Sequence, residues 1–145
     1  MLSIATNDDL AEVCDLLRVM HDENGIGRVN EEKALGVISS HIEEGGCIIS
    51  RSNGDLVGSV GIYQDTWWYS DEKAFFDRWF FVHPEHRTGG HAVRLLGAIK
   101  QAARNESRPF VLHVGTTVDA WAKLKFFRKH LTPFGGSFVY MPEAA

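Results

Sequence analysis

The segment from residue 81 to residue 103 combines residue types that could bind an anion. Its sequence, FVHPEHRTGGHAVRLLGAIKQAA, places two glycines close after Arg87 and directly before an amphipathic run. Free backbone N–H groups at the start of a helix, together with the helix dipole, hold a phosphate without any side chain. The alternative is a plain strand-to-helix turn, in which Gly89 and Gly90 only permit a positive φ. The pattern alone leaves both interpretations open.

Three histidines, His83, His86 and His91, fall in the same segment. A metal site would need carboxylate or thiol ligands beside them and an outer shell that fixes their orientation. Both cysteines are far away in the sequence, and the histidines overlap the expected phosphate loop. The sequence therefore predicts no metal site and no metal cofactor.

The composition limits the class of protein. The chain has 145 residues, enough for one core, and no repeat or linker divides it, so residues 1–145 are expected to form a single domain. A formal net charge of −4 argues against nucleic acid as a partner. No apolar stretch approaches the roughly 20 residues of a membrane helix, and the first residues show no secretory signal. We expect a cytoplasmic protein with no membrane partner, in which Cys14 and Cys47 are buried thiols.

The elements that would position the anion-binding segment follow from hydrophobic periodicity and turn residues. Helices are expected over about 6–20, 30–44, 90–105 and 118–130, with a loop over 21–28. Strands are expected over 2–5, on both sides of Asn53-Gly54 within 47–63, and over 73–82, 109–115 and 135–141. In the last helix, Trp121, Leu124 and one of Phe126 and Phe127 should face inward. This order mixes hairpins with crossovers and predicts an α/β domain with a mixed sheet.

The order of elements resembles the GNAT superfamily of N-acetyltransferases over nearly the whole chain. The acyl-CoA motif of that family reads Arg/Gln-x-x-Gly-x-Gly/Ala and often follows Val-x-Pro. Here Val82-His83-Pro84 precedes Arg87-Thr88-Gly89-Gly90-His91-Ala92. The resemblance implies a GNAT-like fold, with a central, mostly antiparallel sheet, splayed fourth and fifth strands, and flanking helices.

The resemblance also implies where acetyl-CoA, the acetyl donor, would bind. Backbone N–H groups of the motif would hold the CoA pyrophosphate; its residues are Arg87, Thr88, Gly89, Gly90, His91 and Ala92. The pantetheine arm would lie between the splayed strands and contact Phe81, Val82 and His83, mainly through backbone groups. A strand N–H near Phe81 and Val82 would polarise the acyl carbonyl.

Direct attack of an amine on a thioester needs a base, because an alkylammonium must first lose a proton. Members of the resembled family often carry a Glu or Asp on the fourth strand for this purpose. Asp77 lies well inside the strand expected here, where burial would raise its pKa. A structural pair with the neighbouring Arg78 is the alternative. Asp77 is the predicted base.

The acid is where the chain departs from the family pattern. The family commonly carries a tyrosine in its fourth helix, in a motif like Asn-x-x-Ala-x-x-Leu-Tyr, whereas DAWAKLKFFRK places Phe126 or Phe127 there. Phenylalanine has no proton to donate, so the CoA thiolate would leave unassisted, take a proton from water, or use another residue. Among the residues, His113 at the end of the fifth strand is the preferred acid and Tyr140 is the second choice. A structural histidine is the alternative. The departure also keeps a second function open, an acyl-CoA-binding sensor or interaction domain with little or no catalytic activity.

Four side chains are candidates for the acceptor site. Trp67 and Trp68 lie in a loop that borders the acceptor cleft in the resembled fold, and Asp22 and Glu23 could attract a cationic amine there. Core packing or a dimer contact could equally explain the tryptophans, and solubility the carboxylates. The predicted function is transfer of an acetyl group from acetyl-CoA to a primary amine of a small molecule or a protein, and a homodimer stays open.

Overall fold

A computed structural model describes residues 1–116 and 119–142 of the chain. Its centre is a five-stranded sheet with the strands in sequence order. The strands are β1 (Leu2–Ile4), β2 (Cys47–Ser52), β3 (Asp55–Thr66), β4 (Lys73–Val82) and β5 (Phe110–Val111). The first four pair in antiparallel fashion, and β5 pairs with β4 in parallel. The expected mixed, mostly antiparallel sheet is confirmed.

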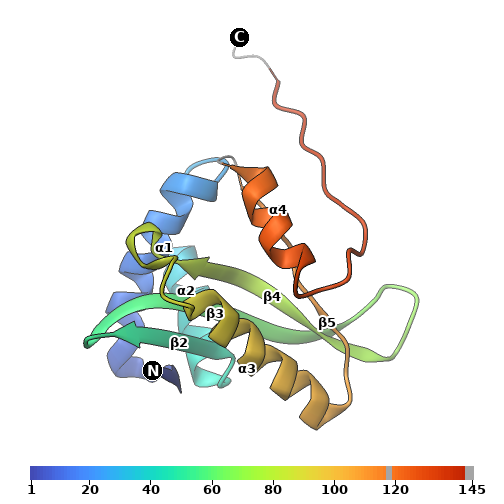
Figure 1. Cartoon of the computed structure of the whole chain (residues 1–145), viewed down its shortest axis with the longest axis horizontal. Coiled ribbons are helices and arrows are strands. Elements are labelled where there is room, and N and C mark those ends of the chain that lie inside the picture. Colours follow the sequence, from blue (N-terminus) through green and yellow to red (C-terminus); the bar gives the residue numbers. More distant parts are fainter. Residues whose placement is uncertain (117–118, 143–145) are drawn as a thin grey trace.

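Helices cover both faces of this sheet (Figure 1). They are α1 (Leu10–Asn24), α2 (Glu31–Glu43), α3 (His91–Glu106) and α4 (Ala120–Arg128), with short 3-10 turns η1 (Asn7–Asp9) and η2 (Pro84–His86). Apolar side chains of α1 and α2 bury one face together with Ile49 and Trp79. Leu95 and Ile99 of α3 pack on Val60 and Val82 across the other face. Helices α1, α2 and α3 therefore bury their apolar stripes on the sheet, as the sequence periodicity predicted.

The fourth and fifth strands diverge. β5 pairs with β4 only at Phe75 and Phe76, near the start of β4. Beyond that point, no described strand lies along the outer edge of β4, so residues 77–82 border a gap. The splay implied by the family resemblance is present.

A β-bulge interrupts β4 at Arg78. Trp79 pairs with Gly61 and Asp77 pairs with Ile62, so Arg78 has no opposite residue on β3. The Arg78 guanidinium lies 4.2 Å from the Tyr63 ring centre. The Trp79 ring lies over Gly61, where any Cβ would come within 2.6 Å of it. Arg78 and Trp79 thus both point to the α2 face, and the alternation of the strand changes phase between them.

The C-terminal part of the chain differs from the prediction. Residues 135–141 form no strand and leave the body of the fold, with Phe138 and Tyr140 exposed (Figure 1). An alternating pattern predicts a strand only where a sheet edge accepts it. The expected inward positions in α4 were also wrong for Trp121, which is 83% exposed, and for Leu124.

Two boundaries differ as well. α1 continues to Asn24, so the expected loop over 21–28 is shorter, and the regular part of β5 covers only two residues of the expected 109–115. Val118, the expected first residue of the last helix, lies outside the described residues. Helix and strand ends depend on hydrogen bonds that hydrophobic periodicity does not encode.

Both cysteines are free thiols, as predicted, with Cys47 buried and Cys14 half-buried. Burial raises the pKa of the Cys47 thiol to about 11. Among the described residues, no helix is both long and apolar enough to cross a membrane.

Candidate active site

The turn between β4 and α3 has the geometry of an anion-binding helix start. Gly90 precedes the helix with a left-handed φ of 75°, and α3 begins at His91. The first N–H groups of a helix have no acceptor one turn earlier, so they stay available to a ligand. No acidic side chain lies in the first turn of α3. The two glycines therefore do more than reverse the chain, because they expose donors at the positive end of a helix dipole.

Side chains crowd both glycines. A Cβ on Gly89 would lie 2.9 Å from the His91 ring and 3.4 Å from the His86 carbonyl oxygen. A Cβ on Gly90 would lie 3.1 Å from the Arg94 guanidinium. A larger residue at either position would therefore displace the side chains around the turn.

The other motif residues have different surroundings. Thr88 is exposed on the turn, and Ala92 packs against the cluster around Val82. The His91 ring points into the protein, where Ser50 Oγ lies 2.7 Å from Nδ1. Burial, followed by the nearby Arg94 charge, lowers the pKa of His91. At this position only the backbone N–H faces the expected ligand.

Arg94 was missed by the sequence reasoning. Its guanidinium donates to the Gly89 carbonyl oxygen at 3.1 Å and lies 3.2 Å from Nδ1 of His91. A cation in the first turn of a helix opposes the helix dipole. An arginine at the start of α3, with no acid in the first turn, is a pattern that favours an anion-binding site at this end of the helix.

The outer edge of β4 presents backbone groups to the gap. The His83 N–H donates to the Val57 carbonyl oxygen of β3 at 2.8 Å. Because strand residues direct their backbone groups to alternate edges, Phe81 also pairs with β3, whereas Phe80 and Val82 face the gap. Backbone contacts from the gap would therefore go to Phe80 and Val82 rather than to Phe81 and His83.

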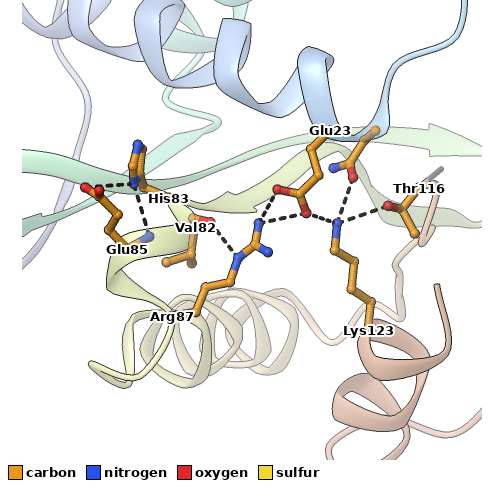
Figure 2. Close-up of polar contacts among 8 residues, drawn as sticks. Glu23, Val82, His83, Glu85, Arg87, Thr116 and Lys123 are labelled. Atoms are coloured by element: carbon orange, nitrogen blue, oxygen red, sulfur yellow. Dashed lines mark hydrogen bonds and ion pairs between the residues drawn. The ribbon is translucent and has the colours of Figure 1, made fainter. Parts of the chain in front are cut away.

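A polar bridge crosses this gap (Figure 2). Arg87 donates from Nε to the Val82 carbonyl oxygen at 3.1 Å and from NH2 to both Glu23 oxygens at 2.8 and 2.9 Å. Lys123 of α4 donates to Glu23, to Asn24 Oδ1 at 2.7 Å and to Thr116 Oγ1 at 3.1 Å. We call the chain Val82–Arg87–Glu23–Lys123–Thr116 the gap bridge. It joins β4, the end of α1, the segment after β5, and α4.

The two acidic candidates for the acceptor site differ. Asp22 is exposed, whereas the Glu23 side chain is 14% exposed and paired with two cations. Burial would raise the pKa of Glu23, but the hydrogen bonds from Arg87 and Lys123 outweigh it and hold this pKa below its usual value. Both residues belong to α1 rather than to the expected loop.

Asp77 and His113 meet where β5 leaves β4. The His113 N–H donates to Asp77 Oδ1 at 2.8 Å, and the ring Nδ1 lies 3.3 Å from the same oxygen. The Asp77 side chain is 5% exposed and that of His113 is 62% exposed. Burial raises the pKa of Asp77, although the hydrogen bond from His113 opposes the shift. The two predicted catalytic residues thus form one pair, and Arg78, the expected structural partner of Asp77, instead stacks on Tyr63.

The phenylalanines at the expected tyrosine position have different neighbours. The Phe127 ring meets Phe80 of β4 edge-on, with the ring centres 5.4 Å apart. Phe126 lies 5.0 Å from the His130 ring. Of the two, Phe127 is the residue that contacts the strand lining the gap.

The tryptophan loop lies at the other end of β4. Trp67 meets Phe76 edge-on at 5.9 Å, and Trp68 is 96% exposed. This loop joins β3 to the start of β4, whereas the glycine turn follows the end of β4 (Figure 1). The structure therefore does not bring Trp67 and Trp68 together with the glycine turn between β4 and α3.

Comparisons with known proteins agree with this geometry. Residues 11–131 match the Acetyltransferase (GNAT) family. A search of curated protein sequences finds no significant match.

Solved structures of similar fold cover nearly the whole chain. A ribosomal-protein-alanine N-acetyltransferase from Brucella melitensis biovar Abortus 2308 has a TM-score of 0.70 at 19% identity, over 97% of this chain and 99% of that one. An aminoglycoside 6'-N-acetyltransferase from Acinetobacter haemolyticus has a TM-score of 0.71 at 14% identity, over 100% and 99%. A GCN5-related N-acetyltransferase from Ralstonia eutropha JMP134 has a TM-score of 0.72 at 17% identity, over 100% and 99%. At these identities the structures show a shared fold, and the sequence match shows the family. The chain belongs to the GNAT family of acetyltransferases.

Proposed function

We propose that this protein transfers the acetyl group of acetyl-CoA to a primary amine, with Asp77 as the base. The observation that carries the proposal is the position of the Asp77–His113 pair. It lies at the mouth of a gap whose edge leads along Phe80 and Val82 directly into the glycine turn. An extended pantetheine arm would add to that edge as a strand does, which would bring the thioester toward Asp77.

The turn supplies the anion site of this proposal. The CoA pyrophosphate would accept hydrogen bonds from backbone N–H groups between Thr88 and Ala92, with the Arg94 guanidinium beside them. Because most of these donors are backbone groups, the other side chains of the turn, apart from the arginines, matter where they would fill the space that the ligand needs.

The protons of the reaction have identifiable acceptors. The acceptor ammonium first loses a proton to Asp77, either directly or through the adjacent His113 ring. The neutral amine then attacks the acetyl carbonyl carbon, the C–S bond breaks, and CoA leaves as a thiolate. The new amide nitrogen loses the second proton. One proton neutralises the thiolate and the other reaches solvent, so the reaction releases one proton in total.

The raised pKa of Asp77 suits this task. A carboxylate with an ordinary pKa is a weak base toward an alkylammonium of pKa near 10, and a higher pKa reduces the mismatch. The Asp77 side chain alone is almost fully buried, so the exposed imidazole of His113 is the member of the pair that could exchange protons with solvent. We propose His113 as the group that returns a proton to the thiolate.

The acceptor class can be narrowed by experiment. Two proteins of similar fold are named for acetylating a ribosomal-protein alanine and an aminoglycoside. We propose an acceptor panel that contains a peptide with an N-terminal alanine, an aminoglycoside, a polyamine and a free amino acid. CoA release with any one of them supports the enzyme, whereas tight acetyl-CoA binding with no acceptor supports the sensor alternative.

The cofactor site has a matched pair of test variants. Gly90→Glu places a side chain and a negative charge at the turn, whereas Gly97→Glu adds the same charge to the same helix at an open position. We expect calorimetry to show loss of acetyl-CoA binding for Gly90→Glu and little change for Gly97→Glu. Circular dichroism must show that both variants fold, because position 90 has a positive φ. Unchanged affinity in folded Gly90→Glu would contradict the site.

A further inference from the structure

A second ligand-binding group lies on the 3-10 turn η2. His83, Glu85 and His86 each offer one nitrogen or oxygen atom, and these three atoms all lie within 4.8 Å of one another. The Glu85 N–H donates to Nδ1 of His83 at 3.3 Å, which holds this ring over the turn (Figure 2). The two imidazole ring centres are 5.9 Å apart. A single tight turn therefore collects three side chains that can bind a metal ion.

The chemistry of this group selects a class of ion. Two imidazoles and one carboxylate suit borderline-soft ions such as Zn²⁺, whereas Mg²⁺ and Ca²⁺ prefer oxygen ligands throughout. Tetrahedral Zn²⁺ needs ligand atoms roughly 3.4 Å apart, which follows from Zn–N and Zn–O lengths of about 2.1 Å. The Glu85 side chain is 82% exposed and the His83 side chain is 32% exposed, so rotation of exposed side chains can close the remaining distance.

The surroundings leave this group independent of its neighbours. His91 is the next histidine, with its ring centre 6.3 Å from that of His86, but its side chain is buried and its nitrogens are not among the three atoms that lie within 4.8 Å of one another. The Arg87 guanidinium points the other way, into the gap bridge (Figure 2). A fourth coordination position would therefore remain for water.

We propose that His83, Glu85 and His86 form a binding site for one transition-metal ion of the Zn²⁺ class. The site lies on the turn that leads into α3, outside the Asp77–His113 pair. It is a binding site of the turn and takes no part in acetyl transfer as proposed above. Bound Zn²⁺ would cross-link three residues of η2 and so stabilise the folded state over the unfolded one.

The test is a calorimetric titration of untagged protein with ZnCl₂ and, separately, with MgCl₂ at neutral pH. We expect one Zn²⁺ per chain, no binding of Mg²⁺, and a rise in melting temperature with Zn²⁺. His86→Gln and Glu85→Gln keep the size and polarity of the turn and each remove one ligand. Since even groups that only support a ligand change metal affinity by about 10–100-fold, each variant should weaken Zn²⁺ binding at least about tenfold.

Two control variants identify the residues responsible. His21→Gln and Glu106→Gln make the same chemical changes on α1 and α3, outside the group, and should bind Zn²⁺ as the unmodified protein does. The proposal is overturned if the unmodified protein binds no Zn²⁺ or if Mg²⁺ binds equally well. It is also overturned if His86→Gln and Glu85→Gln both bind Zn²⁺ with unchanged affinity, because the ion would then lie elsewhere.

Discussion

At the scale of single residues, Asp77 should show its role in the pH dependence of the rate. Removing a positioned base typically costs about 10²–10⁴-fold, so we expect Asp77→Asn to lower kcat by that order. Because burial raises the pKa of Asp77, the rate of the unmodified enzyme should fall with acid at a pH above 3.8. Steady-state rates across pH check both expectations. If Asp77→Asn kept both its rate and the fall of that rate in acid, Asp77 would not be the base.

The same substitution should have the opposite effect on stability. The pKa of folded Asp77 lies above its unfolded value, so between the two values the folded state binds more protons and stability falls as the pH rises. At neutral pH the buried carboxylate therefore opposes folding, and Asn removes that charge while its oxygen can still accept from the His113 N–H.

We accordingly expect Asp77→Asn to melt at an equal or higher temperature than the unmodified protein at neutral pH, with the difference shrinking in acid. Thermal unfolding at several pH values measures it. A lower melting temperature at neutral pH would show that the ionised pair with His113 stabilises the fold, and that the carboxylate is retained for structure.

At the scale of elements, helix α4 has two neighbouring phenylalanines, either of which could occupy the position of the tyrosine that the family commonly carries. Phe127 contacts Phe80 on the strand that lines the gap, whereas Phe126 contacts His130 at the end of the helix. We expect Phe127→Tyr to raise turnover by about tenfold, less than the 10²–10⁴-fold of a well-positioned acid. Phe126→Tyr should leave the rate unchanged. The reverse result would mean that Phe126 faces the thiolate.

The gap bridge predicts a competition between Glu23 and the phosphates of acetyl-CoA for Arg87. Glu23→Gln removes one negative charge from the gap and frees the Arg87 guanidinium. The Arg87 side chain is 39% exposed, so its new pair with a phosphate should be worth at most about 1 kcal/mol, as surface ion pairs are; tenfold in affinity corresponds to 1.4 kcal/mol, so we expect acetyl-CoA to bind about two- to fivefold more tightly.

Calorimetry measures this change, and Asp22→Asn serves as the control because it makes the same charge change on the same helix at an exposed side chain. Equal gains in both variants would indicate a general charge effect. Weaker binding in Glu23→Gln alone would mean that the bridge holds the gap in its binding form and does not compete with the ligand.

The elements themselves were largely readable from the sequence. Asn53-Gly54 marked the β2–β3 hairpin, and both residues adopt the positive φ that this dipeptide favours. The glycine turn and α3 followed from a strand, two glycines and an apolar stripe. Local pattern sufficed there because each signal lies within one element.

The partners of the site residues were not readable in the same way. Glu23 and Arg87 are 64 residues apart, and Asp77 and His113 are 36 apart, so only the fold joins them. Both members of the second pair were found separately, from the base and acid that the chemistry requires. The predicted strand over 135–141 failed because its alternating pattern lacked a partner strand. A strand pattern therefore needs a sheet edge before it becomes a strand.

At the scale of the whole molecule, the C-terminal segment should contribute little to stability. Every described residue from 132 to 142 is exposed. We expect a chain ending at Leu131 to melt within about 2 °C of the full chain, because exposed residues change stability by under about 0.5 kcal/mol. Thermal unfolding measures this.

Size-exclusion chromatography of the same two chains tests the open question of a homodimer. The segment carries Phe134, Phe138 and Tyr140 on its exposed surface, which an association between copies could bury. A large drop in melting temperature together with a change from dimer to monomer would contradict our expectation and show that the segment packs in an assembly.

The bulge at Arg78 determines which face of the sheet each side chain of β4 points to. Along β4 the side chains point to alternate faces of the sheet, and the unpaired Arg78 shifts this alternation by one residue. Odd-numbered residues before the bulge therefore point to the same face as even-numbered residues after it. Asp77 for this reason shares a face with Phe80 and not with Trp79. Deleting Arg78 would remove the bulge and leave Asp77 directly before Trp79, so Asp77 would stay on the Phe80 side; pairing Arg78 regularly with β3 would instead turn Asp77 toward the layer of α1 and α2. The bulge thus accommodates one extra residue while the Asp77 carboxylate stays on the side of the sheet that carries Phe80.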